Sequence, residues 1–144
     1  METIRKMTAA DTKAVVDMMR VFYASDAVYT NGSEEIFLAD VENCTNGSPY
    51  LEGFVIEREG NILGYTMVAK SFSTEFGKPC IWIEDIYVRD EYRGKGLGKR
   101  LMEFILERFT DCIFRLEAES ENEKAIALYE KLGFTDLPYR ELKK

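Results

Sequence analysis

The 144-residue sequence contains no histidine. Catalysis by Ser-His-Asp or Cys-His groups is therefore excluded, and no metal site is expected, because imidazole is one of the main zinc ligands of proteins. Cysteine is scarce as well: Cys44, Cys80 and Cys112 are widely spaced and form no CxxC pair. We expect neither a zinc knuckle nor a disulfide framework, and we interpret each thiol as a small buried hydrophobic side chain.

Long apolar segments are also missing from the chain. No run approaches 18 apolar residues, so no membrane-spanning helix and no membrane partner are expected. The first residues, Met1 to Lys6, have no apolar core of the kind that a signal peptide carries. The expected location is the cytoplasm.

Basic residues are outnumbered: 19 Lys and Arg face 26 Asp and Glu, which gives a formal charge of −7. This balance argues against a nucleic-acid partner, which requires a basic surface. It suits a cationic small molecule or a basic peptide, because an acidic cleft concentrates cations. The length and an apolar content of 46% predict a single domain, residues 1–144, with its own core.

The periodicity of apolar residues predicts a mixed α/β domain without internal repeats or linkers. A helix capped by Thr8 and Asp11 comes first, followed by a polar region with a short helix near Glu34–Asn43. Three strands with hairpin turns follow, and helices and strands then alternate. The expected ranges are strands at 54–58, 62–72, 80–88, 113–119 and 134–142, with helices at 97–109 and from Ser120 onward.

A glycine-rich segment follows the third of these strands and opens the next helix: Arg93-Gly94-Lys95-Gly96-Leu97-Gly98. Glycine lets the backbone approach a ligand, and N–H groups at a helix start favour a pyrophosphate. Lys95 and Lys99 add positive charge. The sequence has no P-loop, and Lys99 and Leu101 stand where a dinucleotide loop needs its third glycine. A turn that serves geometry alone is the alternative.

A second pattern lies about 30 residues further on: Asn122-x-x-Ala125-x-x-x-Tyr129-x-x-x-Gly133-Phe134. Its apolar spacing predicts a short helix that ends at Gly133. Tyr129 lies on the apolar face of this helix. A core aromatic side chain with its hydroxyl at the rim is the plain structural interpretation of Tyr129.

Together, Arg93-x-x-Gly96-x-Gly98 and the second pattern resemble the GNAT superfamily of N-acetyltransferases, most clearly from Gly53 to Phe134. The resemblance implies a mostly antiparallel sheet flanked by helices and split at a V-shaped acetyl-CoA cleft, between strands ending near Val88 and Glu119. Acetyl-CoA would be the co-substrate, and dimers are common in the family. The residues implied to bind it are Ile86, Tyr87, Val88, Arg93, Gly94, Lys95, Gly96, Leu97, Gly98, Lys99 and Asn122.

The acid–base groups must come from carboxylates and tyrosines, since histidine is absent. Glu84 and Asp85 interrupt an apolar strand, and alternation places one of them toward the cleft unless a bulge intervenes. Glu84 resembles a glutamate of some GNAT enzymes, including spermidine/spermine acetyltransferases, and is assigned as general base. Tyr129, near the thioester sulfur, is assigned as general acid, and a backbone N–H near Tyr87 or Val88 as oxyanion donor. Ion pairs at a strand edge are the alternative for Glu84 and Asp85.

Other acidic and aromatic side chains are weaker candidates for binding a cationic acceptor. The acidic ones are interpreted as solvated surface and the aromatic ones as core unless the fold gathers them. They are Glu34, Glu35, Asp40, Glu117 and Glu119, with Tyr29, Phe37, Trp82 and Tyr87.

These observations predict an N-acetyltransferase that transfers acetyl from acetyl-CoA to a primary amine by direct attack in a ternary complex. The acceptor would be a small polyamine-like molecule or a lysine-like amine, and a homodimer stays open. A non-catalytic acyl-CoA-binding or sensing module is the main alternative. A structural or interaction domain whose glycine loop binds nothing is a third.

Overall fold

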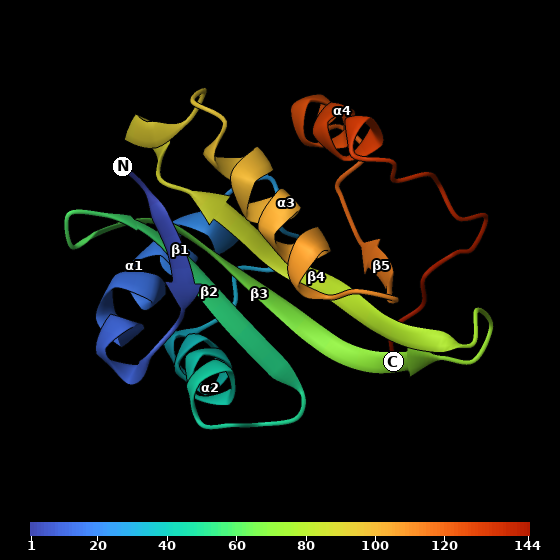
Figure 1. The fold of residues 1–144 in the computed structure, drawn as a ribbon, viewed down its shortest axis with the longest axis horizontal. Helices are drawn as coiled ribbons and strands as arrows, with labels where there is room; N and C mark the ends of the chain where they lie inside the picture. The colour runs from blue at the N-terminus through green and yellow to red at the C-terminus, as the bar shows by residue number, and fades with distance from the viewer.

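The computed structural model describes residues 1–144 and contains a five-stranded sheet with helices on both faces (Figure 1). The strands lie side by side in the sheet in the order in which they occur in the sequence. Strands β1 to β4 are antiparallel, and β5 is parallel to β4. The strands are β1 (Thr3–Lys6), β2 (Leu51–Arg58), β3 (Asn61–Ser73), β4 (Lys78–Val88) and β5 (Ile113–Leu116). The helices are α1 (Thr12–Tyr23), α2 (Glu34–Thr45), α3 (Leu97–Arg108) and α4 (Glu123–Lys131).

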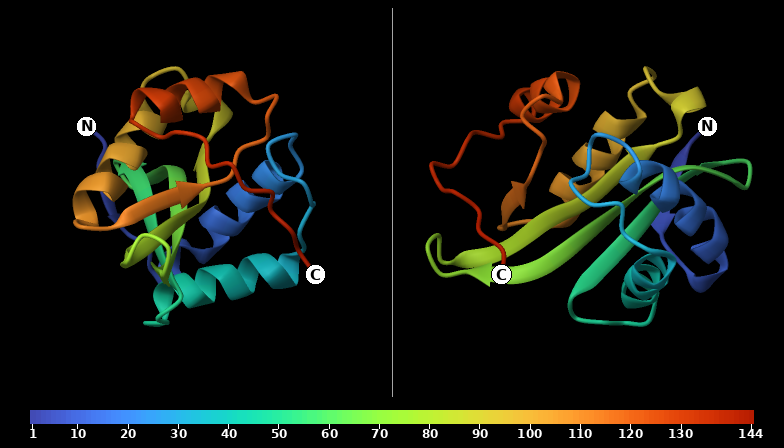
Figure 2. Two further views of the ribbon diagram at one scale, coloured as in Figure 1. Left: turned by 90° about the vertical axis from the view of Figure 1, so that its right-hand side faces the viewer. Right: turned by 180° about the vertical axis from the view of Figure 1, so that it is seen from behind.

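Apolar clusters form on both faces of the sheet because alternate strand residues point to opposite faces. On one face, buried residues of α1 and α2 pack against Val55, Tyr65 and Met67. On the other face, Phe54 and Val68 belong to a cluster that includes residues of α3. The two views of Figure 2 show α1 and α2 on one side of the sheet and α3 and α4 on the other.

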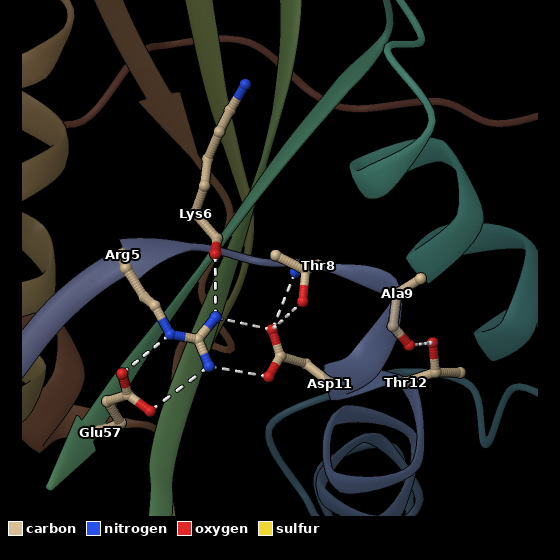
Figure 3. Close-up of polar contacts among 7 residues, drawn as sticks. All are labelled: Arg5, Lys6, Thr8, Ala9, Asp11, Thr12 and Glu57. Carbon is tan, nitrogen blue, oxygen red and sulfur yellow. Dashed lines mark hydrogen bonds and ion pairs between the residues drawn. The ribbon is translucent and has the colours of Figure 1, made fainter. Parts of the chain in front are cut away.

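Strand β1 was not expected from the sequence, because four residues with one large apolar side chain carry almost no strand signal. It forms through pairing with β2, where Thr3 lies opposite Glu57 and Lys6 opposite Phe54. Arg5 then joins β1 to its surroundings: its guanidinium donates to Glu57 and to Asp11 at the start of α1 (Figure 3).

Most of the other expected elements are confirmed. The carboxylate of Asp11 accepts from the Thr8 N–H at 2.8 Å, as the predicted capping pattern requires. Helix α2 begins at Glu34, and Glu59 and Gly60 form the expected hairpin turn with φ of 51° and 82°. Cys44 and Cys80 are buried as expected, whereas the expectation is wrong for Cys112, which is only partly buried.

Three predictions near the C-terminus are wrong. Residues 134–142 form no strand; Pro138 lacks the N–H that a central strand position needs. Strand β5 stops at Leu116 rather than near Glu119. Helix α4 starts at Glu123, not at Ser120, because the Asn122 N–H bonds the Glu119 carbonyl in a preceding turn. No helix of the structure is long and apolar enough to cross a membrane.

Candidate active site

The sheet opens between its last two strands. Parallel pairing of β4 with β5 runs only from Cys80–Ile113 to Ile83–Leu116, whereas β4 continues to Val88. Figure 1 shows the chain after β5 turning away from β4 toward α4. The outer edge of β4 after Ile83 therefore has no strand partner, as the expected V-shaped split requires.

Hydrogen bonds show which backbone groups face this open edge. The Arg89 N–H donates to the Leu63 carbonyl of β3, so the backbone groups of Arg89 point toward β3 and away from the open edge. The Val88 carbonyl instead accepts from Arg93 Nε at 2.8 Å. Because backbone direction alternates along an antiparallel strand, Ile86 faces outward with Val88, and Tyr87 turns its N–H and C=O toward β3.

The glycine-rich loop presents a row of free donors. The N–H groups of residues 94 to 99 donate to no acceptor in the protein. Gly94 and Gly96 have φ of 77° and 79°, so the turn itself requires glycine there. Gly98 is different: it lies in α3 with ordinary helical φ, and a Cβ added to it would meet nothing within 4 Å. Packing within the protein therefore does not require glycine at position 98.

The side chains of this loop have mixed roles. The guanidinium carbon of Arg93 lies 5.1 Å from the ring centre of Tyr87, and Arg93 forms an ion pair with Asp90 at 2.6 Å. Arg93 therefore stabilises the end of β4. Leu97 is 3% exposed and anchors α3 in the core. The Lys95 ammonium lies 6.0 Å from the ring centre of Tyr92. Lys99 is more than half exposed and has only a weak contact with Glu103 at 3.7 Å. Lys95 and Lys99 remain as cations beside the free N–H groups.

A β-bulge sets the direction of the two strand carboxylates. Asp85 lies opposite Met67 and Ile83 opposite Val68, which leaves Glu84 as the extra, unpaired residue. The strict alternation that would separate Glu84 from Asp85 therefore does not hold. Asp85 is 3% exposed, and its carboxylate accepts from the hydroxyls of Tyr23 at 2.8 Å and Tyr65 at 2.7 Å.

Burial raises the pKa of each carboxyl in this region, and nearby negative charges raise it further for Glu84 and Asp40. For Glu84, burial raises the pKa first, and the nearby charges of Asp85 and Glu141 raise it further. Asp85 has a pKa raised by burial, which the two tyrosine hydroxyls partly oppose. Burial together with Asp85 and Glu84 raises the pKa of Asp40, on α2, to about 6. A proton or a cationic ligand near these groups therefore stabilises the site.

The C-terminal segment brings more carboxylates to the same place. It returns from α4 past β5 (Figure 2). There a hydrogen bond that the protonated Glu117 carboxyl donates to Glu141, together with burial and repulsion, raises the pKa of Glu117 to about 7. Glu84, Asp85, Asp40, Glu117 and Glu141 form no ion pair with a Lys or Arg. We call these five residues the acidic cluster.

Tyr129 lies on α4, where its ring packs against Phe134 with the ring centres 6.1 Å apart. It borders the same apolar cluster as Ile86. Burial raises the pKa of its hydroxyl, so the hydroxyl stays protonated at neutral pH. The hydroxyl donates a hydrogen bond to no group of the protein. Asn122 precedes α4, and its carbonyl accepts from the Ile126 N–H at 3.1 Å.

Sequence reasoning missed Tyr23 and Glu141 and gave Asp40 and Glu117 low weight. Tyr23 ends an ordinary amphipathic helix, so only the hydrogen bond to Asp85 reveals its position. Of the remaining weaker candidates, Glu34 is bound to Arg20, Tyr29 is exposed and Phe37 is buried in the core, so none of these three joins the acidic cluster.

The sequence profile of the acetyltransferase (GNAT) family matches residues 16–134. The chain belongs to this family. Thialysine N-epsilon-acetyltransferase of Sus scrofa is 40% identical over 79 residues, which cover 53% of this chain and 46% of that protein. An uncharacterised N-acetyltransferase of Bacillus subtilis is 30% identical over 142 residues, covering 92% and 89% of the two chains. The chain thus matches about half the length of the thialysine enzyme.

Several solved structures share the fold of this GNAT chain. A possible acetyltransferase from Clostridium difficile 630 superimposes with a TM-score of 0.83 at 20% identity, covering 99% of this chain and 96% of that one. An aminoglycoside N-acetyltransferase in complex with a bisubstrate analogue of CoA gives a TM-score of 0.80 at 17% identity, covering 100% and 97%. At such identities the likeness concerns the fold.

Proposed function

We propose that this GNAT chain transfers the acetyl group of acetyl-CoA to a primary amine by direct attack in a ternary complex. The observation that carries the proposal is the open outer edge of β4 next to six unpaired N–H groups at the start of α3. In this proposal the N–H groups of residues 94–99, with Lys95 and Lys99, hold the pyrophosphate. Ile86 and Val88 pair with the pantetheine arm as an added strand would.

The reaction balances without a further reactant. The amine nitrogen forms a bond to the acetyl carbonyl carbon, the carbon–sulfur bond breaks, and the amine loses one proton while the thiolate gains one. Acetyl-CoA supplies the activated acyl group. We assign the outward N–H of Val88 as the donor to the carbonyl oxygen; the inward direction of the Tyr87 N–H argues against that residue.

Glu84 is the proposed general base. Its raised pKa, its lack of an ion pair and its position at the bulge support this role, because a base must be free to accept a proton near neutral pH. Asp85 is fixed by two phenols beneath it and is a positioning residue in this proposal. Tyr129, protonated and without a protein partner, is the proposed acid for the leaving thiolate.

The acidic cluster favours a cationic acceptor. This agrees with relatives whose names refer to amine substrates: the thialysine enzyme, and a spermine/spermidine N(1)-acetyltransferase of Bacillus subtilis that is 23% identical over 108 residues. The test is thiol release from acetyl-CoA with a panel of diamines, polyamines and amino acids, with mass detection of the product. Tight binding of CoA without acetylation of any amine would instead support the binding-module alternative, and failure of CoA to raise the melting temperature would support a structural domain.

A further inference from the structure

The face of the sheet that carries Asp85 extends toward the β3–β4 hairpin. Asp85 lies opposite Met67 and Trp82 opposite Ala69. Met67 and Ala69 are two positions apart on β3, so they share a face, and their partners share it with them. Arg115 of β5 pairs with Trp82 and points to the same side. One surface therefore connects Asp85 with Trp82 and Arg115.

A cavity of about 350 Å³ lies at the hairpin end of this surface. Arg115 and Trp82 line it, together with hydroxyl groups of the hairpin such as those of Ser71 and Ser73. The guanidinium carbon of Arg115 lies 4.6 Å from the ring centre of Trp82, which holds the cation in place.

Arg115 has no anionic partner in the protein. It forms no ion pair, and its Nε is buried without a hydrogen-bond acceptor. A buried donor without an acceptor destabilises the fold, whereas a carboxylate bound in a fork by guanidinium removes that deficit. The residue is therefore suited to a negatively charged group that enters the cavity.

The same cavity also offers a negative charge. Glu75 lines it and is held there by the hydroxyl of Tyr139 from the C-terminal segment. A guanidinium and a carboxylate in one cavity complement the carboxylate and ammonium of an α-amino acid. A polyamine lacks the carboxylate, and Arg115 would repel its ammonium groups.

The spacing to the acidic cluster suits such a ligand. Trp82 and Glu84 are two residues apart on β4, which corresponds to about 7 Å along a strand. The surface is thus basic at Arg115 and acidic at Glu84. An amino acid whose side chain carries a primary amine on a few methylene groups matches both ends.

We infer that the acceptor is a free α-amino acid with a side-chain primary amine, and that Arg115, stacked on Trp82, binds its carboxylate. This inference deepens the proposed N-acetyltransferase function and depends on it for the reaction, although not for the binding.

L-Lysine and cadaverine provide the test, because cadaverine is lysine without its carboxylate. The wild-type protein should acetylate L-lysine with a kcat/KM at least tenfold higher than cadaverine. Arg115→Gln should remove this preference by raising KM for L-lysine at least tenfold, while kcat/KM for cadaverine stays level or rises because the repulsion by the guanidinium is lost. Lys78→Gln removes one positive charge from the same hairpin outside the cavity and should preserve the preference.

L-Lysine amide tests the same contact without a mutation, should Arg115→Gln fail to fold: it keeps both amines and lacks only the carboxylate charge. Equal rates for the three acceptors with the wild-type protein would overturn the inference and leave the proposed function standing. If no amine is acetylated, the proposed function fails. Calorimetry of L-lysine with the CoA-loaded protein then decides the inference alone: binding weakened at least tenfold by Arg115→Gln supports it, and no binding to wild type overturns it.

Discussion

Gly98 is the position at which the proposed binding of acetyl-CoA can be separated from folding. It has helical φ near the start of α3, and an added Cβ meets nothing within 4 Å. Replacing glycine by alanine in a helix stabilises it by up to about 1 kcal/mol. In a domain of this size that corresponds to a rise in melting temperature of about 2–4 °C. The fold alone thus predicts a benefit from Gly98→Ala.

The proposed ligand predicts the opposite effect on affinity. Gly98→Asp places a carboxylate beside the free N–H groups of residues 94–99, where it stabilises the helix start by about 0.3–1 kcal/mol. The same carboxylate repels a pyrophosphate and competes for its donors. We expect affinity for CoA to fall at least tenfold, which is about 1.4 kcal/mol, while the melting temperature of the free protein stays level or rises.

Calorimetry with CoA and thermal unfolding of the free protein measure the two effects on the same samples. Gly96→Ala is the contrasting variant: its φ of 79° strains any residue with a Cβ, so its melting temperature should fall. If Gly98→Asp is folded and binds CoA as tightly as the wild type, the loop does not hold the pyrophosphate and the reasoning from Gly98 is refuted.

Tyr129→Phe deletes only the hydroxyl and should lower kcat on the order of 10²-fold with little change in CoA affinity; a normal kcat would leave Tyr129 as a packing residue. With Glu84→Gln, steady-state kinetics should show a loss of about 10²–10⁴-fold at neutral pH and partial recovery at high pH, where the amine deprotonates in solution. The wild-type rate should rise with pH through the elevated pKa of Glu84, and this limb should vanish in Glu84→Gln but persist in the exposed control Glu107→Gln. Gly64→Ala should destabilise the protein by about 1–3 kcal/mol in urea unfolding, because its Cβ would lie 2.4 Å from the Tyr87 carbonyl oxygen; unchanged stability would contradict that close approach.

The local order of elements and the glycine loop could be predicted from the sequence. Apolar spacing in α1 and α3, the turn at Glu59 and Gly60, and the position of Gly96 before a helix are all determined by residues close together in the chain. Short-range sterics and hydrogen bonding govern such features, so they are visible in a short window of sequence.

The structure of the C-terminal region could not be predicted from such short-range features. Residues 134–142 have an apolar content typical of a strand, but a strand exists only when another strand accepts its hydrogen bonds. Strand β1 is the reverse case: Thr3–Lys6 looks unremarkable and becomes a strand because β2 and the contacts of Arg5 with Glu57 and Asp11 hold it.

The candidate site divides in the same way. The presence of Glu84, Asp85 and Tyr129 followed from the sequence, because charged residues in an apolar strand and a tyrosine on an apolar helix face are local signals. The surroundings of these residues in the folded protein could not be predicted from the sequence. The bulge at Glu84 appears only in the register of β4 against β3, and the hydrogen bond between Tyr23 and Asp85 joins residues 62 positions apart.

The acidic cluster and the cavity at Arg115 were decided by tertiary structure alone. Asp40, Glu117 and Glu141 come from three distant segments, and each by itself resembles solvated surface. The pKa values of Asp40 and Glu117 are raised because desolvation and the like charges of neighbouring carboxylates disfavour the ionised form. Composition thus determined that the chain is acidic, and only the packing of its elements determined where that charge gathers.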